Sequence, residues 1–355
     1  MSKGIVSEGA LEPQRRPLIE WLLERHPDTP RTRAKQWILA GRVRVNGEVL
    51  RKPHQVIDDP AHQMELLQRA PTTLDCGAGW LIHPRVTLLY IDSAIAVVNK
   101  GPGLISVPAP NTELSALSIL QDFLSGRLKA RDRAIPGRAL PHAFRRLALL
   151  PVHRLDQYTS GVFCMACNPA ARIHLIQQLK ERTMKREYVA FVQGRAKSPK
   201  GTWRQWIELS EDQMRQRVVS EHKAQAALRR ASEAVTHFEV IAEYRVAQTG
   251  DFVAKLRLRL ETGLKHQIRL QAASAGLPLI GDRTYNPAYR PGSVQPARLE
   301  FSRQALHADR LTLEHPDMPG KQISRTAELP PDLRELEARL IAISAQDKTK
   351  KVVAP

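Results

Sequence analysis

The sequence predicts an α+β fold that is divided between two domains. With 355 residues, the chain is longer than one compact core usually absorbs, and its 42% apolar residues suffice for a sizeable core. Hairpin signals recur along it with only occasional helices, which favours α+β over regular alternation of strands and helices. We expect a small module at residues 15–73, a larger domain at 80–343 and a basic tail at 344–355.

The composition predicts a polyanionic partner. Lys and Arg total 54 against 36 Asp and Glu, which gives a formal net charge of +18. Each phosphate that a cation neutralises releases condensed counterions, so this excess favours RNA or DNA over an anionic membrane. Lys348, Lys350 and Lys351 supply only three of the charges, so the basic character belongs to the folded body rather than to a tail.

No segment has the features of a signal peptide or a membrane span. Met1 to Pro13 lacks an apolar core of the necessary length, and no later run approaches about 18 apolar residues. The three cysteines, at positions 76, 164 and 167, suit a reducing compartment better than a disulfide scaffold. We therefore expect a cytoplasmic monomer with no membrane attachment.

The first module combines helices with a basic hairpin. Apolar residues recur with helical spacing over 18–23, and a second helix is expected over 32–40. Residues 42–49 alternate valine and arginine before Asn46-Gly47, a pair that tolerates the positive φ angles of a tight turn. Helix and hairpin together present a short basic span: Arg31, Arg33, Lys35, Arg42, Arg44, Arg51 and Lys52.

This module carries a recognisable pattern. Gly41-Arg42-Val43-Arg44-Val45-Asn46-Gly47, followed by Lys52-Pro53, resembles the small RNA-binding module first recognised in a ribosomal small-subunit protein. The usual opening Arg-Leu-Asp of that module is missing. The resemblance implies that Arg31, Arg33, Lys35, Arg42 and Arg44 bind RNA, and an ordinary surface hairpin with solvated arginines is the alternative.

The larger domain is expected to contain strands, turns and a few helices. Residues 71–80 predict a turn-rich link, and 124–150 predict an irregular insertion. Asn168-Pro169 predicts the start of a helix that reaches about Arg182. One face of that helix is expected to hold Ile173, Ile176 and Leu179. Strands are expected at 185–192, at 252–260 and in two pieces over 90–100, whereas the charged stretch 196–236 is expected to be surface structure.

Asp156 stands in the first of three polar motifs. His153-Arg154-Leu155-Asp156 precedes Thr159-Ser160-Gly161 and the apolar run 162–166. A loop that leads into a buried strand can hold a reactive group on rigid support. A carboxylate kept ionised by nearby cations could act as a nucleophile or as a base. Taken alone, however, the motif is explained better by a surface ion pair.

The second and third motifs supply an aromatic residue and a cation. In a strand over 185–194, Tyr188 shares a face with Ala190 and Val192 and should point toward the core or a pocket. Between Glu261 and Asp282 a strand is expected to pass through Gly263 into a helix. The first turns of this helix hold His266, Gln267 and Arg269, where backbone donors favour anions. Arg269 can pair with a carboxylate or a phosphate.

In this order, the three motifs closely resemble those of the RluA family of RNA pseudouridine synthases. The family patterns His-Arg-Leu-Asp-x-x-Thr-Ser-Gly, Lys-x-Tyr-x-Ala-x-Val-x-Gly and His-Gln-Ile-Arg appear at 153–161, 186–194 and 266–269. A Gly-x-Pro-Ile-x-Gly-Asp segment follows and ends at Asp282. The resemblance spans about Leu88 to Pro316.

The resemblance implies a catalytic domain with a central mixed, mainly antiparallel sheet flanked by helices. It makes Asp156 the catalytic carboxylate, Tyr188 the aromatic residue against the target uracil, and Arg269 the cation paired with Asp156. Arg154 would fill the space left by a flipped uridine. The remaining RNA-binding residues would be His153, Lys265, His266 and Gln267.

The implied reaction isomerises a uridine that has left the RNA stack. Extrusion costs a few kcal/mol, and stacking on an aromatic ring returns roughly 1–3 kcal/mol. A carboxylate can then attack the sugar, or remove a sugar proton to give a glycal-type intermediate, and the sequence does not choose between these routes. We expect no metal, nucleotide or redox cofactor.

Two positions depart from the family pattern, and one pair of cysteines needs an explanation. The family's Thr-Gly-Arg is Thr262-Gly263-Leu264 here, although Lys265 can replace the charge, and its usual histidine after Ile-Arg-x is Gln271. Cys164 and Cys167 match a zinc or redox spacing. No second pair accompanies them, so we expect packed core thiols.

The leading hypothesis is a pseudouridine synthase that acts on ribosomal RNA. A tRNA-directed synthase is one alternative, and a catalytically inactive RNA-binding or ribosome-assembly factor is another. A hydrolase that uses His153 with Asp156 lacks a suitable nucleophile nearby.

Overall fold

The computed structural model describes residues 15–39, 41–58, 63–67, 73–110, 114–128, 142–209, 216–226, 231–246, 251–290 and 299–352. The chain divides into two compact units, one made of 1–73 with 317–321 and the other of 74–316 with 322–355. Each unit has a hydrophobic core of its own.

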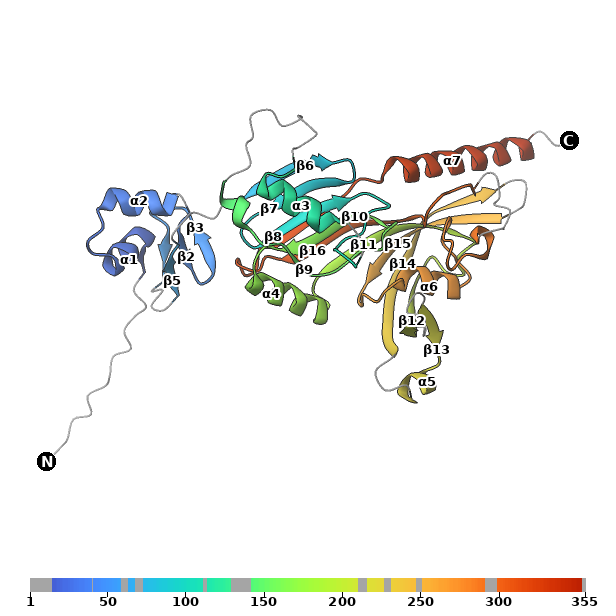
Figure 1. Ribbon diagram of the computed structural model, residues 1–355, viewed down its shortest axis with the longest axis horizontal. Helices are drawn as coiled ribbons and strands as arrows, with labels where there is room; N and C mark the ends of the chain where they lie inside the picture. The colour runs from blue at the N-terminus through green and yellow to red at the C-terminus, as the bar shows by residue number, and fades with distance from the viewer. Residues whose placement is uncertain are drawn as a thin grey trace. The chain divides into compact units, whose positions relative to one another are not determined.

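The N-terminal unit contains the expected helices and hairpin (Figure 1). Helices α1 (Leu18–Arg25) and α2 (Arg31–Leu39) pack their apolar residues against a sheet in the order β3 (Glu48–Leu50), β2 (Val43–Val45) and β5 (Met64–Leu66). A short pair joins β1 (Arg16–Pro17) to β4 (Val56–Ile57). Asn46 and Gly47 have φ angles of 51° and 81°, which confirms the predicted tight turn between β2 and β3.

The larger unit is built on one mixed sheet. In the described part of the chain its strands follow the order β13 (Gln216–Val219), β12 (Lys200–Leu209), β14 (Ala231–Val246), β15 (Asp251–Leu260), β11 (Lys185–Gln193), β16 (Leu306–Glu314), β10 (Ser160–Ala166), β8 (Ile95–Lys100), β7 (Val86–Ile91) and β6 (Leu74–His83). Strand β17 (Gln322–Thr326) pairs with β16, and β9 (Leu150–Pro151) pairs with β10. Among the described strands, β10 and β16 form the one parallel pair, so the expected mixed, mainly antiparallel sheet is confirmed.

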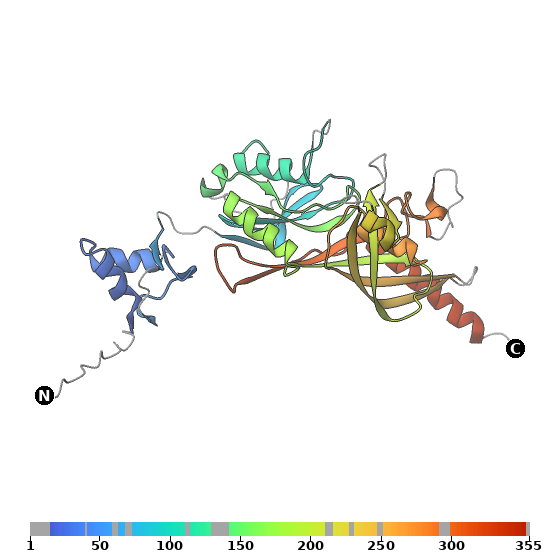
Figure 2. The ribbon, with the colours of Figure 1, turned by 90° about the horizontal axis from the view of Figure 1, so that it is seen from below.

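Helices cover both faces of this sheet. Along β10, Phe163 and Met165 pack in the core that holds α3 (Ala116–Ser125) and α6 (Gln267–Ser274). Their neighbours Val162 and Cys164 face the core of α4 (Pro169–Lys180). Helix α7 (Pro331–Val352) packs through its first turns on β14. Figure 2 shows the curvature of the long strands β14 and β15, whose pairing shifts register near Val240.

Several element predictions are wrong in ways that tertiary packing explains. Residues 74–80 belong to strand β6 rather than to a turn-rich link, and 196–236 contribute β12, β13 and the start of β14 to the sheet. Part of the expected insertion at 124–150 forms the short helix η1 (His142–Arg146), while 129–141 lie outside the described residues. Helix α7 extends into the expected basic tail as far as Val352.

Helix α4 begins as predicted but buries another face. Asn168 caps it by accepting a hydrogen bond from the Ala171 backbone (2.8 Å). Ala171 and Leu175 are fully buried and Leu179 packs against the same core, whereas Ile173 is 70% exposed, so the prediction is wrong for Ile173. No helix in the described ranges is long and apolar enough to cross a membrane.

Candidate active site

Asp156 lies where two hollows of the larger unit meet. A cavity of about 250 Å³ is lined by Asp156 together with Tyr188, Arg186 and Leu264. A wider hollow of about 950 Å³ opens on the other side. Both hollows are also lined by Arg154, Leu155, His266 and Arg269. The carboxylate can therefore act on a group that is enclosed in the smaller cavity and still joined to a chain in the wider one.

The loop that carries Asp156 is held by side chains beneath its backbone. Ser106 Oγ donates to the Leu155 carbonyl and accepts from the Leu155 amide, both at 2.9 Å. Lys100 Nζ donates to the Gln157 carbonyl (3.1 Å), and Arg303 Nη1 donates to the Tyr158 carbonyl (3.0 Å). These contacts fix the loop on both sides of Asp156, which limits the movement of its carboxylate.

Lys100 is fully buried beneath the loop. Burial lowers the pKa of its ammonium to about 7, with help from the positive charges of Arg303 and Arg85 and against the opposing charge of Asp156. The spacing of residues in the sequence does not indicate that the Lys100 side chain turns inward.

Gly161 allows the loop to continue into the sheet. Its φ is 117°, and a Cβ at this position would lie 2.1 Å from the Ala308 carbonyl oxygen. Here β10 and β16 pair in parallel. Gly161 is therefore needed for the close approach of two strands at the end of the loop that carries Asp156.

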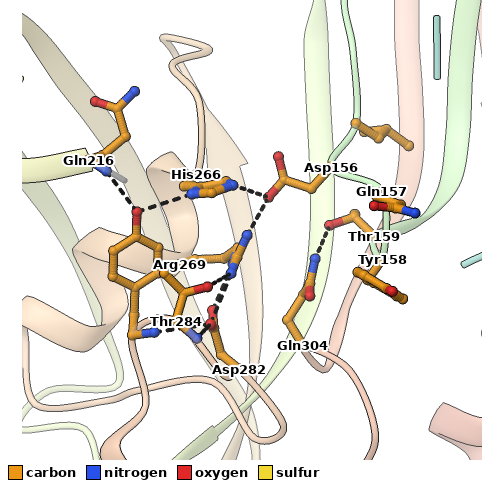
Figure 3. A network of polar contacts seen from close by, with 12 residues as sticks. Asp156, Gln157, Tyr158, Thr159, Gln216, His266, Arg269, Asp282, Thr284 and Gln304 are labelled. Carbon is orange, nitrogen blue, oxygen red and sulfur yellow. Dashed lines mark hydrogen bonds and ion pairs between the residues drawn. The ribbon is translucent and has the colours of Figure 1, made fainter. Parts of the chain in front are cut away.

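Arg269 joins two carboxylates, as Figure 3 shows. Its Nη1 donates to Asp156 Oδ2 (3.1 Å), while Nε and Nη2 donate to Asp282 Oδ2 and Oδ1 (2.7 and 2.9 Å). Burial would lower the pKa of Arg269, but the hydrogen bonds and charges of Asp282 and Asp156 outweigh it and raise that pKa. Burial likewise would raise the pKa of Asp282, and the bonds from Arg269 and from the Thr284 and Tyr285 amides hold it below its ordinary value.

His266 approaches Asp156 without forming an ion pair at neutral pH. Its Nε2 lies 3.9 Å from Asp156 Oδ2, and its Nδ1 bonds with the Tyr285 hydroxyl at 3.0 Å (Figure 3). Burial lowers the pKa of His266 to about 4, since the attraction of Asp156 is weaker than burial combined with the repulsion of Arg269 and Lys265. The imidazole is therefore neutral near pH 7.

Tyr188 lies in β11 and lines the smaller cavity. The β11–β16 pairing shifts register between Glu187 and Tyr188, and such a bulge re-aims the following side chain. Burial raises the pKa of the Tyr188 phenol, which keeps it neutral. The structure thus brings together the three residues that the sequence motifs singled out: Asp156, Tyr188 and Arg269.

The other predicted site residues of this unit differ in their exposure and in whether they line the cavity. Arg154 is exposed at the mouth of both hollows, whereas His153 lines the cavity and accepts a hydrogen bond from the Cys164 amide (3.2 Å). Burial lowers the pKa of His153 to about 3, so it supplies no positive charge near pH 7. Gln267 is buried: its Nε2 donates to the Val235 carbonyl and the Thr236 hydroxyl, and its Oε1 accepts from the Thr262 hydroxyl and the Leu264 amide. Lys265 is not among the residues that line either hollow.

The two departures from the family pattern have different surroundings. Gln271 is fully buried and bonds to the Thr236 hydroxyl and to the Trp203 and Ala234 carbonyls, so it supports β12 and β14. Leu264 lines the smaller cavity and packs near Ile207.

The cysteines are core thiols, as predicted. Cys164 and Cys167 are buried and form no disulfide, and burial raises the pKa of Cys164 to about 12.

In the N-terminal unit, the basic residues form two groups. Arg31, Arg33 and Lys35 are exposed on α2. Arg42 Nε donates to the Leu67 carbonyl (2.8 Å), and Arg44 Nη1 lies 3.5 Å from Glu65 Oε2. The exposed side chains of α2 are consequently the most available cations of the predicted set.

Comparison with known proteins accounts for this arrangement. Residues 94–274 match the family described as RNA pseudouridylate synthase. The chain belongs to the RNA pseudouridylate synthase family. Residues 16–60 match the S4 domain, so the chain joins an S4 domain to a pseudouridine synthase domain.

The relatives are similar along most of their length. An uncharacterised RNA pseudouridine synthase of Bacillus subtilis, YlyB, is 31% identical over 318 residues, which is 89% of this chain and 91% of the relative. The ribosomal large subunit pseudouridine synthase D of Escherichia coli K12 is 31% identical over 332 residues, 89% of this chain and 87% of that one. The structure of human RNA pseudouridylate synthase domain containing 1 shares the fold, with a TM-score of 0.50 and 24% identity over 74% of this chain and 89% of that one.

Proposed function

We propose that this pseudouridine synthase isomerises a uridine of ribosomal RNA, with Asp156 as the catalytic carboxylate. The observation that carries the proposal is the ion pair of Asp156 with Arg269 at the edge of a cavity that Tyr188 also lines. The relatives named for the large ribosomal subunit support ribosomal RNA as the substrate.

The geometry suits a flipped nucleotide. The target base enters the smaller cavity and lies against the Tyr188 ring, while the attached strand stays in the wider hollow. Extrusion costs a few kcal/mol, and aromatic stacking returns roughly 1–3 kcal/mol. Arg154 stands at the entrance to both hollows, where it can occupy the space that the uridine leaves in the RNA.

Asp156 acts on the sugar of this nucleotide. Arg269 orients the carboxylate through one hydrogen bond, because its own position is fixed by two hydrogen bonds to buried Asp282. The carboxylate then attacks carbon 1′ or removes a proton from the sugar, and in both cases the bond between the sugar and N1 breaks. The detached uracil turns, and its carbon 5 bonds to carbon 1′.

The S4 domain adds a second RNA-binding surface, which we assign to Arg31, Arg33 and Lys35 together with Arg42 and Arg44. Two linked surfaces suit a large structured RNA better than a short one. The enzyme would then act in the cytoplasm as a monomer. A tRNA substrate is the second candidate. An RNA-binding factor without activity is disfavoured, because Asp156, Tyr188 and Arg269 are all present.

Asp156→Asn and Asp156→Ala test the proposal. Each variant is expected to abolish pseudouridine formation while leaving RNA affinity within a few-fold, because the carboxylate contributes to chemistry rather than to phosphate binding. The measurement is pseudouridine mapping across cellular RNA with and without the protein, followed by complementation with each variant. Full modification by either variant would contradict the assignment, and a mapped site in transfer RNA would move the substrate to that class.

A further inference from the structure

Arg186 is a second buried cation in the cavity of Asp156 and Tyr188. Arg186 is 7% exposed, and its Nε is buried without a hydrogen-bond partner. Nη2 donates to the Thr262 and Glu261 carbonyls (3.1 and 3.4 Å). Within the described part of the chain, no carboxylate forms an ion pair with Arg186. A buried charge of this kind costs folding free energy, so it is expected where it meets a ligand.

Arg186 lines the cavity beside Tyr188. Arg186 and Tyr188 are two residues apart in β11 and line the same cavity, and the charges of Arg186 and Asp156 both act on the Tyr188 phenol. A Cβ on Gly263 would lie 2.4 Å from Arg186 Nη1, so this glycine makes room for the guanidinium.

The other residues that line the cavity do not supply an enclosed positive charge that is free to meet an anion. Arg269 is paired with two carboxylates. His153 is neutral near pH 7, and Leu264 stands where the family motif has an arginine. Arg154 is exposed to solvent at the entrance. Arg186 is thus the enclosed cation of the cavity that is left without an anion among the described residues.

The reaction produces such an anion. When the bond between N1 and carbon 1′ breaks, both bonding electrons stay with the uracil, and negative charge spreads over N1, O2 and O4. Carbon 1′ bonds to the Asp156 carboxylate, or the sugar loses its 2′ proton. When carbon 5 bonds to carbon 1′, the ester bond to Asp156 breaks on the first route, and the 2′ proton returns to the sugar from Asp156 on the second. The proton of carbon 5 then leaves, and N1 is protonated again. The uracil anion occurs on both routes.

We propose that Arg186 is a further catalytic residue, which binds a carbonyl oxygen of the flipped uracil and stabilises the uracil anion while the glycosidic bond is broken. This inference rests on the proposed function. Fixed donors aimed at developing charge are among the largest contributions to catalysis, and the loss of one such donor typically lowers kcat roughly 100-fold to 1,000-fold. The same contact holds the detached base inside the cavity while it turns.

The test compares Arg186→Gln and Arg186→Lys in the full-length protein with the parent. Large-subunit ribosomal RNA from cells that lack the protein serves as substrate, labelled with tritium at carbon 5 of uridine, whose release reports bond formation at that carbon. Lys185→Gln is the matched control, since it removes a neighbouring charge that is exposed. We expect Arg186→Gln to lower the single-turnover rate by about 100-fold or more with little change in RNA affinity. Arg186→Lys should recover much of the rate, and the control should match the parent.

A second substrate separates anion stabilisation from support of the fold. In RNA that contains 5-fluorouridine, the fluorine itself stabilises the departing anion, so the loss caused by Arg186→Gln should be several-fold smaller, as measured by mass spectrometry of the nucleosides. Equal losses with both substrates, or a rate for Arg186→Gln within threefold of the parent, would overturn the proposal. If Asp156→Ala retained activity in the same assay, the proposed function itself would fail. If Asp156→Ala were inactive and Arg186→Gln fully active, the proposed role of Arg186 would be refuted and the proposed function would stand.

Discussion

Arg269 lies between an accessible carboxylate and a buried one, and the two partners do different work. Asp156 is 18% exposed in its side chain, whereas Asp282 is inaccessible. Asp282 binds two nitrogens of Arg269 and two backbone amides, so it fixes the guanidinium from behind. Asp156 is left with one hydrogen bond from this group and keeps an oxygen available to substrate.

Asp282→Asn is therefore expected to damage both stability and activity. Removal of one partner from a buried ion pair typically costs about 3–5 kcal/mol, and a less firmly held Arg269 should lower kcat more than it raises KM. Chemical denaturation and single-turnover kinetics measure the two effects. Asp309→Asn is a control at a half-buried aspartate outside the two hollows. If Asp282→Asn had the activity of the parent, the contact with Asp156 would be sufficient to orient Arg269 without the Asp282 carboxylate.

The β7–β8 hairpin illustrates how one side chain can organise an element. Asp92 Oδ1 accepts hydrogen bonds from the Ala94 and Ile95 amides (2.7 and 2.8 Å), which closes the turn. Its Oδ2 bonds with the Tyr90 hydroxyl and with His315 Nε2, just beyond the end of β16. The turn is thereby tied to the strand that pairs with both β10 and β11.

This arrangement predicts a dependence of stability on acid. Burial would raise the pKa of Asp92, but His315, Tyr90 and the Ile95 amide outweigh it and lower that pKa below 3.8. A lowered carboxyl pKa contributes stability that is present above the ordinary value and is lost as the pH falls through the lowered one. Asp92→Asn should therefore lower the free energy of unfolding at pH 7 by about 1–3 kcal/mol, and with it the Tm. Below about pH 4 the Tm of the variant should decline less steeply with falling pH than the Tm of the parent.

Thermal melts at several pH values provide the measurement, with the exposed Glu181→Gln as a control that should follow the parent. If Asp92→Asn lost stability in parallel with the parent at every acidic pH, Asp92 would not be the source of the dependence.

At the scale of the whole molecule, the two RNA-binding surfaces that we propose belong to two units with separate cores. The exposed cations of α2 belong to the smaller unit, whereas the described residues that line the cavity of Asp156 belong to the larger one. Their contribution to binding should be electrostatic and hence sensitive to salt, while chemistry should be independent of them.

A triple variant, Arg31→Gln with Arg33→Gln and Lys35→Gln, tests this division. If each residue neutralises one phosphate, the slope of the logarithm of affinity against the logarithm of salt concentration should fall by about 2. Modification of a short RNA that reaches only the active site should proceed at the parent rate. Titrations at several salt concentrations measure the slope, and an unchanged slope would refute the role of the S4 domain.

The sequence by itself determined the fold class, the hairpin at Asn46-Gly47 and the start of α4, because local signals such as turn residues and caps depend on a few neighbours. It also singled out Asp156, Tyr188 and Arg269, since ordered motifs carry the family's chemistry in residue types alone. It missed strands β6, β12 and β13, which lie toward the two ends of the sheet, because their mixed residues give no clear alternation of apolar and polar positions.

Only the tertiary structure decided which polar side chains turn inward. Lys100 and Arg303 hold the loop of Asp156, and Asp282 holds Arg269, through contacts between residues far apart in the chain. Gln267, expected at the RNA, lines the smaller cavity and also joins backbone segments. The charge of a residue is written in the sequence, but its partner and its exposure are set by long-range packing. For the same reason, only the tertiary structure shows that Arg186 is buried beside the cavity without a carboxylate partner among the described residues.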